Sequence, residues 1–93
     1  MMEHLSIKEI HDRLAELEGW EMHGSEIVKD FEFEDSKKAI EFANKVAEEA
    51  ERQHHHPSIN IRYNKVMITL TTHDANGLTY MDFKLARVIE QLV

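Results

Sequence analysis

Three consecutive histidines, His54, His55 and His56, stand directly before Pro57, the only proline in the chain. A further histidine, His73, follows a stretch whose pattern is typical of a β-hairpin. Imidazole gains and loses a proton near neutral pH, so a group of these side chains can carry protons to and from a bound substrate. The same side chains can coordinate a metal ion. In a third interpretation, they only decorate a solvated helix end, where a protonated imidazole is favoured.

The three interpretations differ in what they require of the chain. Adjacent histidines seldom bind one ion from regular structure, although His55, His56 and His73 could do so from a loop. The chain has no cysteine, which excludes disulfides, thiolate metal sites and a cysteine nucleophile. Glu51 lies four residues before His55, one helical turn away, so its carboxylate is expected to contact and orient the His55 imidazole. A carboxylate paired with an imidazole favours the proton-transfer interpretation.

The N-terminal third of the chain predicts one helix and two strands. Ser6 and Glu9 match a capping box that opens a helix, and Gly19 is expected to end that helix as a C′ residue. A strand begins over residues 20–22. A second strand follows over residues 27–33, where apolar and acidic residues alternate as in a half-solvated antiparallel strand.

Two further helices flank the histidine-rich region. Asp35 or Ser36 is expected to cap a helix whose apolar residues cover an arc of about 160°. This helix must end before Pro57, because the residue that precedes a proline avoids the α region. Thr79 and Asp82 resemble the N-cap signature of a final helix.

Between these helices the sequence predicts a β-hairpin that would bring histidines together. Residues 59–63 and 66–71 alternate in polarity, and residues 64–65 suit a two-residue turn. Counted from that turn, the ladder places His56 opposite His73. Directly opposed residues have Cβ atoms about 4.5–5.5 Å apart. The hairpin therefore predicts that imidazoles from two separate segments meet at one end of the sheet.

The order of elements defines a fold class. The predicted order is helix, strand, strand, helix, strand, strand, helix, which makes an α+β domain with one four-stranded antiparallel sheet and three helices packed on one face. With 93 residues, the chain is expected to form a single domain over residues 1–93. No apolar run approaches the roughly 20 residues that span a bilayer, and no secretory signal is evident, so we expect a cytoplasmic protein. The net charge of −7 argues against binding to nucleic acid or to anionic membranes.

The histidine region also resembles a known family. The motif Glu51-x-x-x-His55-His56-Pro57, followed by Thr72-His73-Asp74-x-x-Gly77-Leu78-Thr79-x-x-Asp82, is similar to that of pterin-4a-carbinolamine dehydratases, and the likeness covers nearly the whole chain. The resemblance implies a hydro-lyase that removes water from 4a-hydroxytetrahydrobiopterin or a related 4a-hydroxytetrahydropterin. The product would be quinonoid dihydropterin, which supports tetrahydropterin recycling. It also implies a homodimer or homotetramer that uses no metal and no bound cofactor.

The resemblance assigns roles to particular residues. It places catalysis on the imidazoles of His55, His56 and His73, with Glu51 in support. Substrate binding would fall to Pro57, Thr72, Asp74, Ala75, Trp20 and Asp82. The reaction needs a proton delivered to the departing hydroxyl and another removed from the ring nitrogen N5, which suits imidazole. The sequence does not assign acid and base; we favour His55 and His73 for proton transfer, with His56 holding the substrate.

Three positions depart from the family pattern. Ile59 stands where an aromatic residue is common, Asp74 where glutamate is common, and His54 where aspartate is common. These differences bear on substrate affinity and stereoisomer preference more than on the reaction. In animals the family implies a second role as a dimerisation cofactor, which no feature here supports. A non-catalytic protein-interaction module remains the alternative function, and a His-rich metal-binding protein the third.

Overall fold

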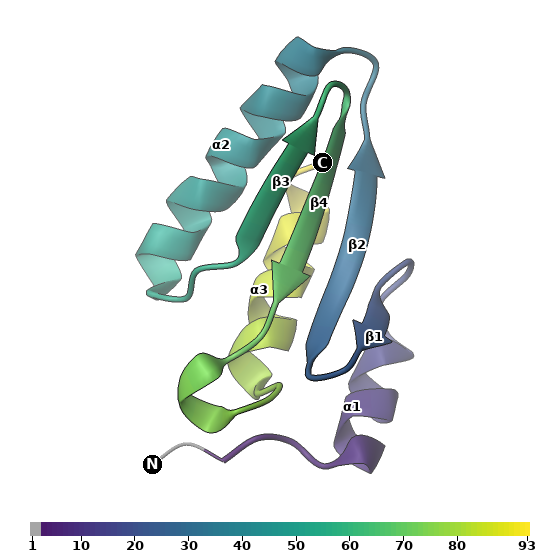
Figure 1. Ribbon diagram of the computed structural model, residues 1–93, viewed down its shortest axis with the longest axis vertical. Helices are drawn as coiled ribbons and strands as arrows, with labels where there is room; N and C mark the ends of the chain where they lie inside the picture. The colour runs from purple at the N-terminus through teal and green to yellow at the C-terminus, as the bar shows by residue number, and fades with distance from the viewer. Residues whose placement is uncertain (1–2) are drawn as a thin grey trace.

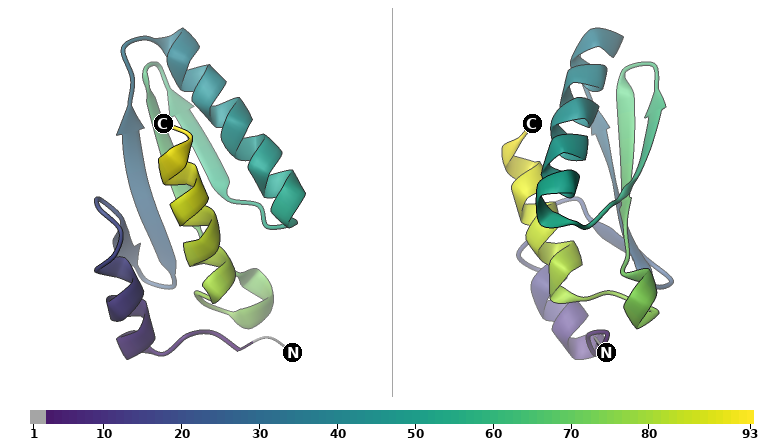
Figure 2. Two further views of the ribbon diagram at one scale, coloured as in Figure 1. Left: turned by 180° about the vertical axis from the view of Figure 1, so that it is seen from behind. Right: turned by 90° about the vertical axis from the view of Figure 1, so that its left-hand side faces the viewer.

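The computed structural model describes residues 3–93, and their backbone forms one sheet with helices on one side (Figures 1 and 2). Within that range the elements are α1 (Ile7–Leu14), β1 (Glu21–His23), β2 (Glu26–Glu32), α2 (Ser36–Gln53), β3 (Ser58–Arg62), β4 (Lys65–Leu70), the 3₁₀ turn η1 (His73–Ala75) and α3 (Tyr80–Gln91). All strand pairs are antiparallel, in the order β1-β2-β4-β3. The predicted α+β class and element order are confirmed.

The core lies between the sheet and its helices. Inward side chains of the two central strands meet the apolar faces of α2 and α3, and the fully or almost fully buried members include Ile27, Phe31, Val66, Ile68, Leu70, Phe42, Val46, Phe83, Leu85 and Ile89. Alternation in the strands and three- to four-residue spacing in the helices put these side chains on one side of each element. No helix within residues 3–93 is long and apolar enough to span a membrane.

The first helix is shorter than the sequence predicts. The capping box of Ser6 and Glu9 is present, but α1 ends at Leu14, so the prediction that Gly19 ends it as a C′ residue is wrong. Tighter i→i+3 bonds follow, with the Leu17 N–H donating to the Leu14 carbonyl at 3.0 Å. Such turns preserve apolar contacts three residues apart, so spacing alone does not separate them from an α-helix. Gly19 instead has a φ of +85° in the turn into β1, where a Cβ would lie 3.0 Å from the Lys29 side chain.

The turn between β3 and β4 also differs from its prediction. Arg62 pairs with Lys65, so the two-residue turn is Tyr63-Asn64 and not Asn64-Lys65. The Asn64 side-chain amide donates to the Phe33 carbonyl at 2.9 Å, and the Asn64 carbonyl accepts from the Phe33 N–H at 2.8 Å. This tertiary pair outweighs the local preference of asparagine for positive φ, which Tyr63 adopts instead at 56°.

The shifted turn changes the register at the other end of the hairpin. The last paired residues are Ser58 and Thr69, so continued counting brings His56 level with Thr71. The prediction that His56 lies opposite His73 is therefore wrong. Because the shift equals two residues, each side chain keeps the face of the sheet that the sequence predicts.

Candidate active site

A pocket of about 240 Å³ is lined by residues that follow the end of α2, the end of β4 and the start of η1. Its lining consists of His54, His55, His56, Thr71, Thr72, His73 and Asp74. Four of these side chains are imidazoles, and they come from two segments separated by the β3–β4 hairpin. The structure thus brings together the four histidines that the sequence singles out, although not through the predicted register.

The end of α2 determines how the histidines enter this pocket. His54 has a left-handed backbone with a φ of 53°. Its N–H donates to the Glu51 carbonyl at 3.2 Å, and the N–H of His55 donates to the Ala50 carbonyl at 3.0 Å. These two bonds make a Schellman motif, with His54 at the C′ position that glycine usually occupies. The motif reverses the chain, so His55 leaves the helix surface and points toward α3.

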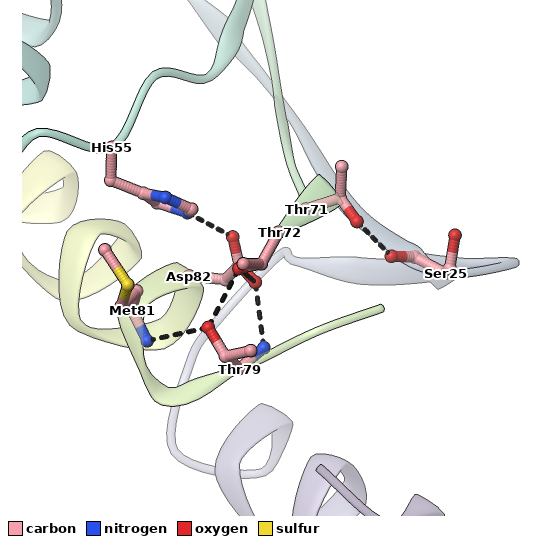
Figure 3. Close-up of polar contacts among 7 residues, drawn as sticks. All are labelled: Ser25, His55, Thr71, Thr72, Thr79, Met81 and Asp82. Carbon is pink, nitrogen blue, oxygen red and sulfur yellow. Dashed lines mark hydrogen bonds and ion pairs between the residues drawn. The ribbon is translucent and has the colours of Figure 1, made fainter. Parts of the chain in front are cut away.

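His55 makes the shortest polar contact in the site. Its Nε2 lies 2.5 Å from Oδ1 of Asp82, in the first turn of α3 (Figure 3). The His55 side chain is 9% exposed, and that of Asp82 is completely buried. A carboxylate paired in this way fixes the orientation and tautomer of an imidazole and stabilises the protonated ring.

The second oxygen of Asp82 is held by two threonines. Oδ2 accepts the Thr72 hydroxyl at 2.8 Å and the Thr79 backbone N–H at 2.9 Å. Since the only hydroxyl proton of Thr72 goes to Asp82, the Thr79 hydroxyl donates to Thr72 Oγ1 across 2.8 Å. Thr79 Oγ1 in turn accepts the N–H of Met81 at 3.2 Å. Within residues 3–93, no buried side-chain polar atom lacks a hydrogen-bond partner.

This network bears on which ring nitrogen of His55 carries a proton. Oδ2 of Asp82 accepts two hydrogen bonds, and in the tautomer of His55 that carries its proton on Nε2 this nitrogen donates to Oδ1. Nδ1 of His55 makes no hydrogen bond to any described residue. It is therefore the ring nitrogen that remains for exchanging a proton with a ligand.

The loop that carries His73 is closed on itself. The N–H of Thr72 donates to the Gly77 carbonyl at 3.1 Å, and the N–H of Gly77 donates back at 3.3 Å. Between these bonds η1 presents His73 and Asp74 to solvent, while Ala75 is buried. The two hydrogen bonds fix the backbone of this short loop, which places the exposed imidazole of His73 at the edge of the pocket.

Glu51 does not support the histidine that the sequence predicts. Its Oε1 lies 3.0 Å from Nε2 of His56, whereas His55 binds Asp82. The prediction that Glu51 orients His55 is wrong because the left-handed residue at 54 interrupts the helical i, i+4 spacing. The pair of Glu51 and His56 is exposed on the surface, where an ion pair contributes little.

Four of the predicted substrate-binding residues lie outside the lining of the pocket. Trp20 donates from Nε1 to Oε2 of Glu90 at 3.0 Å, in the last turn of α3, whereas Asp82 is in its first turn. Eight residues of helix separate these positions by about 12 Å, and Trp20 is not among the residues that line the pocket. Asp82 is completely buried and contacts the His55 ring. Pro57 is half-buried and Ala75 buried, each beside lining residues in the chain.

Three residues of the site are not among the predicted catalytic or substrate-binding residues. His54 and Thr71 line the pocket, and Thr79 completes the network around Asp82. Thr71 also donates its hydroxyl to the Ser25 carbonyl at 2.7 Å, which ties the end of β4 to the β1–β2 turn (Figure 3). The signature Thr79-x-x-Asp82 could have indicated the network, since a capping-box carboxylate has a second oxygen to offer.

Two other features of the described residues bear on alternative chemistry. Among residues 3–93, no group of three or more His, Asp or Glu side chains is arranged to hold a metal ion. A larger pocket of about 370 Å³ lies between the N-terminal segment and the β1–β2 turn, but its lining is mainly apolar and His4 is its one titratable side chain. The pocket that holds the histidines is therefore the candidate active site.

Comparisons with known proteins show which family the chain resembles. A family model described as Pterin 4 alpha carbinolamine dehydratase matches residues 3–92. A relative from Cyanothece sp., provisionally named a pterin-4-alpha-carbinolamine dehydratase, is 52% identical over 92 residues, which cover 99% of this chain and 95% of the relative. One of the same provisional name from Sulfurisphaera tokodaii is 46% identical and covers 99% of both chains.

A solved structure extends the likeness to three dimensions. The crystal structure of a transcriptional coactivator/pterin dehydratase from Brucella melitensis matches with a TM-score of 0.92 at 35% identity, over 96% of this chain and 97% of that one. The family resemblance carried by the histidine motif is thereby confirmed. The chain belongs to the pterin-4a-carbinolamine dehydratase family.

Proposed function

We propose that this protein removes water from a 4a-hydroxytetrahydropterin, with 4a-hydroxytetrahydrobiopterin as the expected substrate, and so supports tetrahydropterin recycling. The observation that carries the proposal is one pocket lined by His55, His56 and His73, in which a buried carboxylate fixes the first of these rings. Family membership supports the same reaction class.

The proposed reaction breaks one C–O bond and forms one C=N double bond. The hydroxyl on C4a takes up a proton and leaves as water, while N5 loses its proton and its electron pair forms the double bond to C4a. One proton is delivered and one is removed, so no oxidant, reductant or metal is needed for the balance. General acids and bases each accelerate such a step by about 10²–10⁴-fold.

The geometry supports particular roles for the three rings. Neutral His55 carries its proton on Nε2, so Nδ1 can accept the N5 proton while the Asp82 carboxylate stabilises the resulting imidazolium. His73, exposed on η1, is the proposed acid for the departing hydroxyl. His56, held by Glu51, is proposed to bind the pterin ring.

A rate assay on generated carbinolamine tests the proposal. The parent should accelerate the loss of the ultraviolet absorbance of the 4a-carbinolamine. His55→Ala and His73→Ala should each reduce kcat/KM by about 10²-fold or more. His11→Ala is a matched control, because His11 is exposed on α1 and does not line the pocket. Equal rates for the parent and both pocket variants would contradict histidine catalysis. A parent without acceleration would point to a non-catalytic interaction module.

A further inference from the structure

The N-terminal segment passes along the loop that carries His73, on the side away from the end of α2 (Figures 1 and 2). The N–H of Leu5 donates to the Leu78 carbonyl at 2.7 Å, and the Leu5 side chain packs against the core. Ser6 then caps α1. Residues 4–6, which we call the strap, therefore connect α1 and the core to the end of the His73 loop.

The strap also explains why residue 77 is a glycine. Gly77 is not among the residues with positive φ, so its backbone conformation does not require glycine. A Cβ at this position would lie 3.0 Å from the Cβ of His4 and 3.2 Å from its Cγ, so one of the two segments would have to move. Gly77 also exchanges two backbone hydrogen bonds with Thr72 on the other side. The missing side chain thus lets the strap pack directly on the loop.

Open space borders the loop beside these contacts. Asn76 and Gly77 line two pockets, of about 370 and 190 Å³. The hydroxyl of Thr71, bound to the Ser25 carbonyl, fixes the chain where it enters the loop. The strap fixes the chain where it leaves the loop, at residues 77 and 78. Because side chains do not fill the space between, the placement of the loop depends on these two restraints.

We propose that the strap is a positioning element of the active site, which holds the loop through Gly77 and Leu78 so that the His73 imidazole stays at the pocket. The inference rests on the proposed function, in which His73 delivers the proton to the departing hydroxyl. Neither His4 nor Leu5 lines the histidine pocket, so both act through the loop. A misplacement of about 1 Å can cost about 10²-fold in rate, so loosening the strap should lower kcat more than it raises KM.

Two substitutions at the contact test the proposal. Gly77→Ala adds the Cβ that meets His4, and we expect kcat to fall by about 10-fold or more with KM changed by less than threefold. The double variant with His4→Gly removes the opposing Cβ and should recover kcat to within about threefold of the parent. Two substitutions that merely weakened the fold would add their losses, so recovery separates positioning from general destabilisation. His4→Gly alone keeps the Leu5 bond and should retain kcat within about threefold.

A second pair of variants isolates the backbone hydrogen bond. Leu5→Pro removes the N–H that donates to the Leu78 carbonyl, whereas Leu5→Ala keeps this bond and loses only core packing. The proline variant should lower kcat as Gly77→Ala does. The alanine variant should lower Tm while kcat stays within about twofold of the parent. Equal kcat for the two variants would overturn the role of this bond.

Nuclear magnetic resonance of the histidine rings gives a readout that does not depend on turnover. In Gly77→Ala the ring resonances of His73 should shift, whereas those of His23, exposed on β1, should not. The inference is overturned if Gly77→Ala matches the parent in kcat and in these resonances, or if His4→Gly fails to restore kcat. A parent without dehydration activity would overturn the proposed function. Unchanged His73 resonances in Gly77→Ala would then overturn the strap as well, and shifted ones would support it as the element that positions the loop.

Discussion

His55 Nε2 and Asp82 Oδ1 lie 2.5 Å apart, and this contact joins the end of α2 to the beginning of α3. The same carboxylate closes the capping box of α3 through the Thr79 N–H. Asp82 therefore serves helix capping, core hydrogen bonding and the orientation of a pocket imidazole at once. Because the Asp82 carboxylate is completely buried, losing any one of these hydrogen bonds would leave a polar atom without a partner and weaken the others.

Asp82→Asn should separate positioning from binding. The amide has nearly the shape of the carboxylate but no charge, and its nitrogen cannot accept from His55 Nε2. We expect kcat to fall by about 10²-fold or more with KM changed by less than threefold, as for a buried carboxylate that orients a catalytic imidazole. Steady-state kinetics on the purified variant measure both values. A rise in KM with unchanged kcat would instead place Asp82 in direct contact with the substrate.

Thr72→Val should destabilise the fold through the same network. Valine has the shape of threonine but cannot donate to Asp82, which leaves buried polar groups with fewer partners. The expected cost is about 1–3 kcal/mol of unfolding free energy in urea. Thr72→Ser keeps the hydroxyl and is the control, with a smaller loss. Equal stability of the valine variant and the parent would show that the network contributes nothing.

Glu51→Gln tests the difference between the sequence prediction and the structure. In the structure Glu51 pairs with exposed His56, so its loss should lower stability by less than about 1 kcal/mol and kcat/KM by less than about 10-fold. If Glu51 oriented His55, the loss in kcat would match that of Asp82→Asn. Assaying the two variants side by side distinguishes these assignments.

Trp20→Phe should affect stability alone. The variant removes the indole N–H that donates to Glu90, a carboxylate that also binds the half-buried Lys29 ammonium at 2.8 Å. We expect a loss of about 1–3 kcal/mol of unfolding free energy and an unchanged kcat/KM. A decrease in kcat/KM beyond about threefold would return Trp20 to the substrate site.

The surface around β3 combines an edge strand with exposed apolar side chains. β3 is an edge strand, and Ile61 and Tyr63 near its tip are 43% and 73% exposed. We expect a homodimer or homotetramer, as the family resemblance implies, because exposed edges and apolar side chains promote pairing between chains. Light scattering after gel filtration measures the mass. Ile61→Lys should shift the population toward the monomer, and a parent that is monomeric at high concentration would contradict this expectation.

Much of the fold followed from local patterns in the sequence. Alternating polarity marked the strands, three- to four-residue spacing marked α2 and α3, and Ser6, Asp35 and Thr79 marked where the helices begin. These features are encoded by neighbouring residues, so a single chain reveals them. The histidine motif is likewise a pattern of residue types along the chain, and it identified the family.

The partners within the site required the tertiary structure. The sequence predicts that Glu51 orients His55, whereas in the structure the left-handed backbone at His54 turns His55 toward the distant Asp82 in α3. Likewise, Asn64 hydrogen-bonds Phe33 in the connection between β2 and α2, and the hairpin turn lies one residue earlier than predicted. Both outcomes depend on hydrogen bonds between residues far apart in the chain, whose energies no local pattern contains.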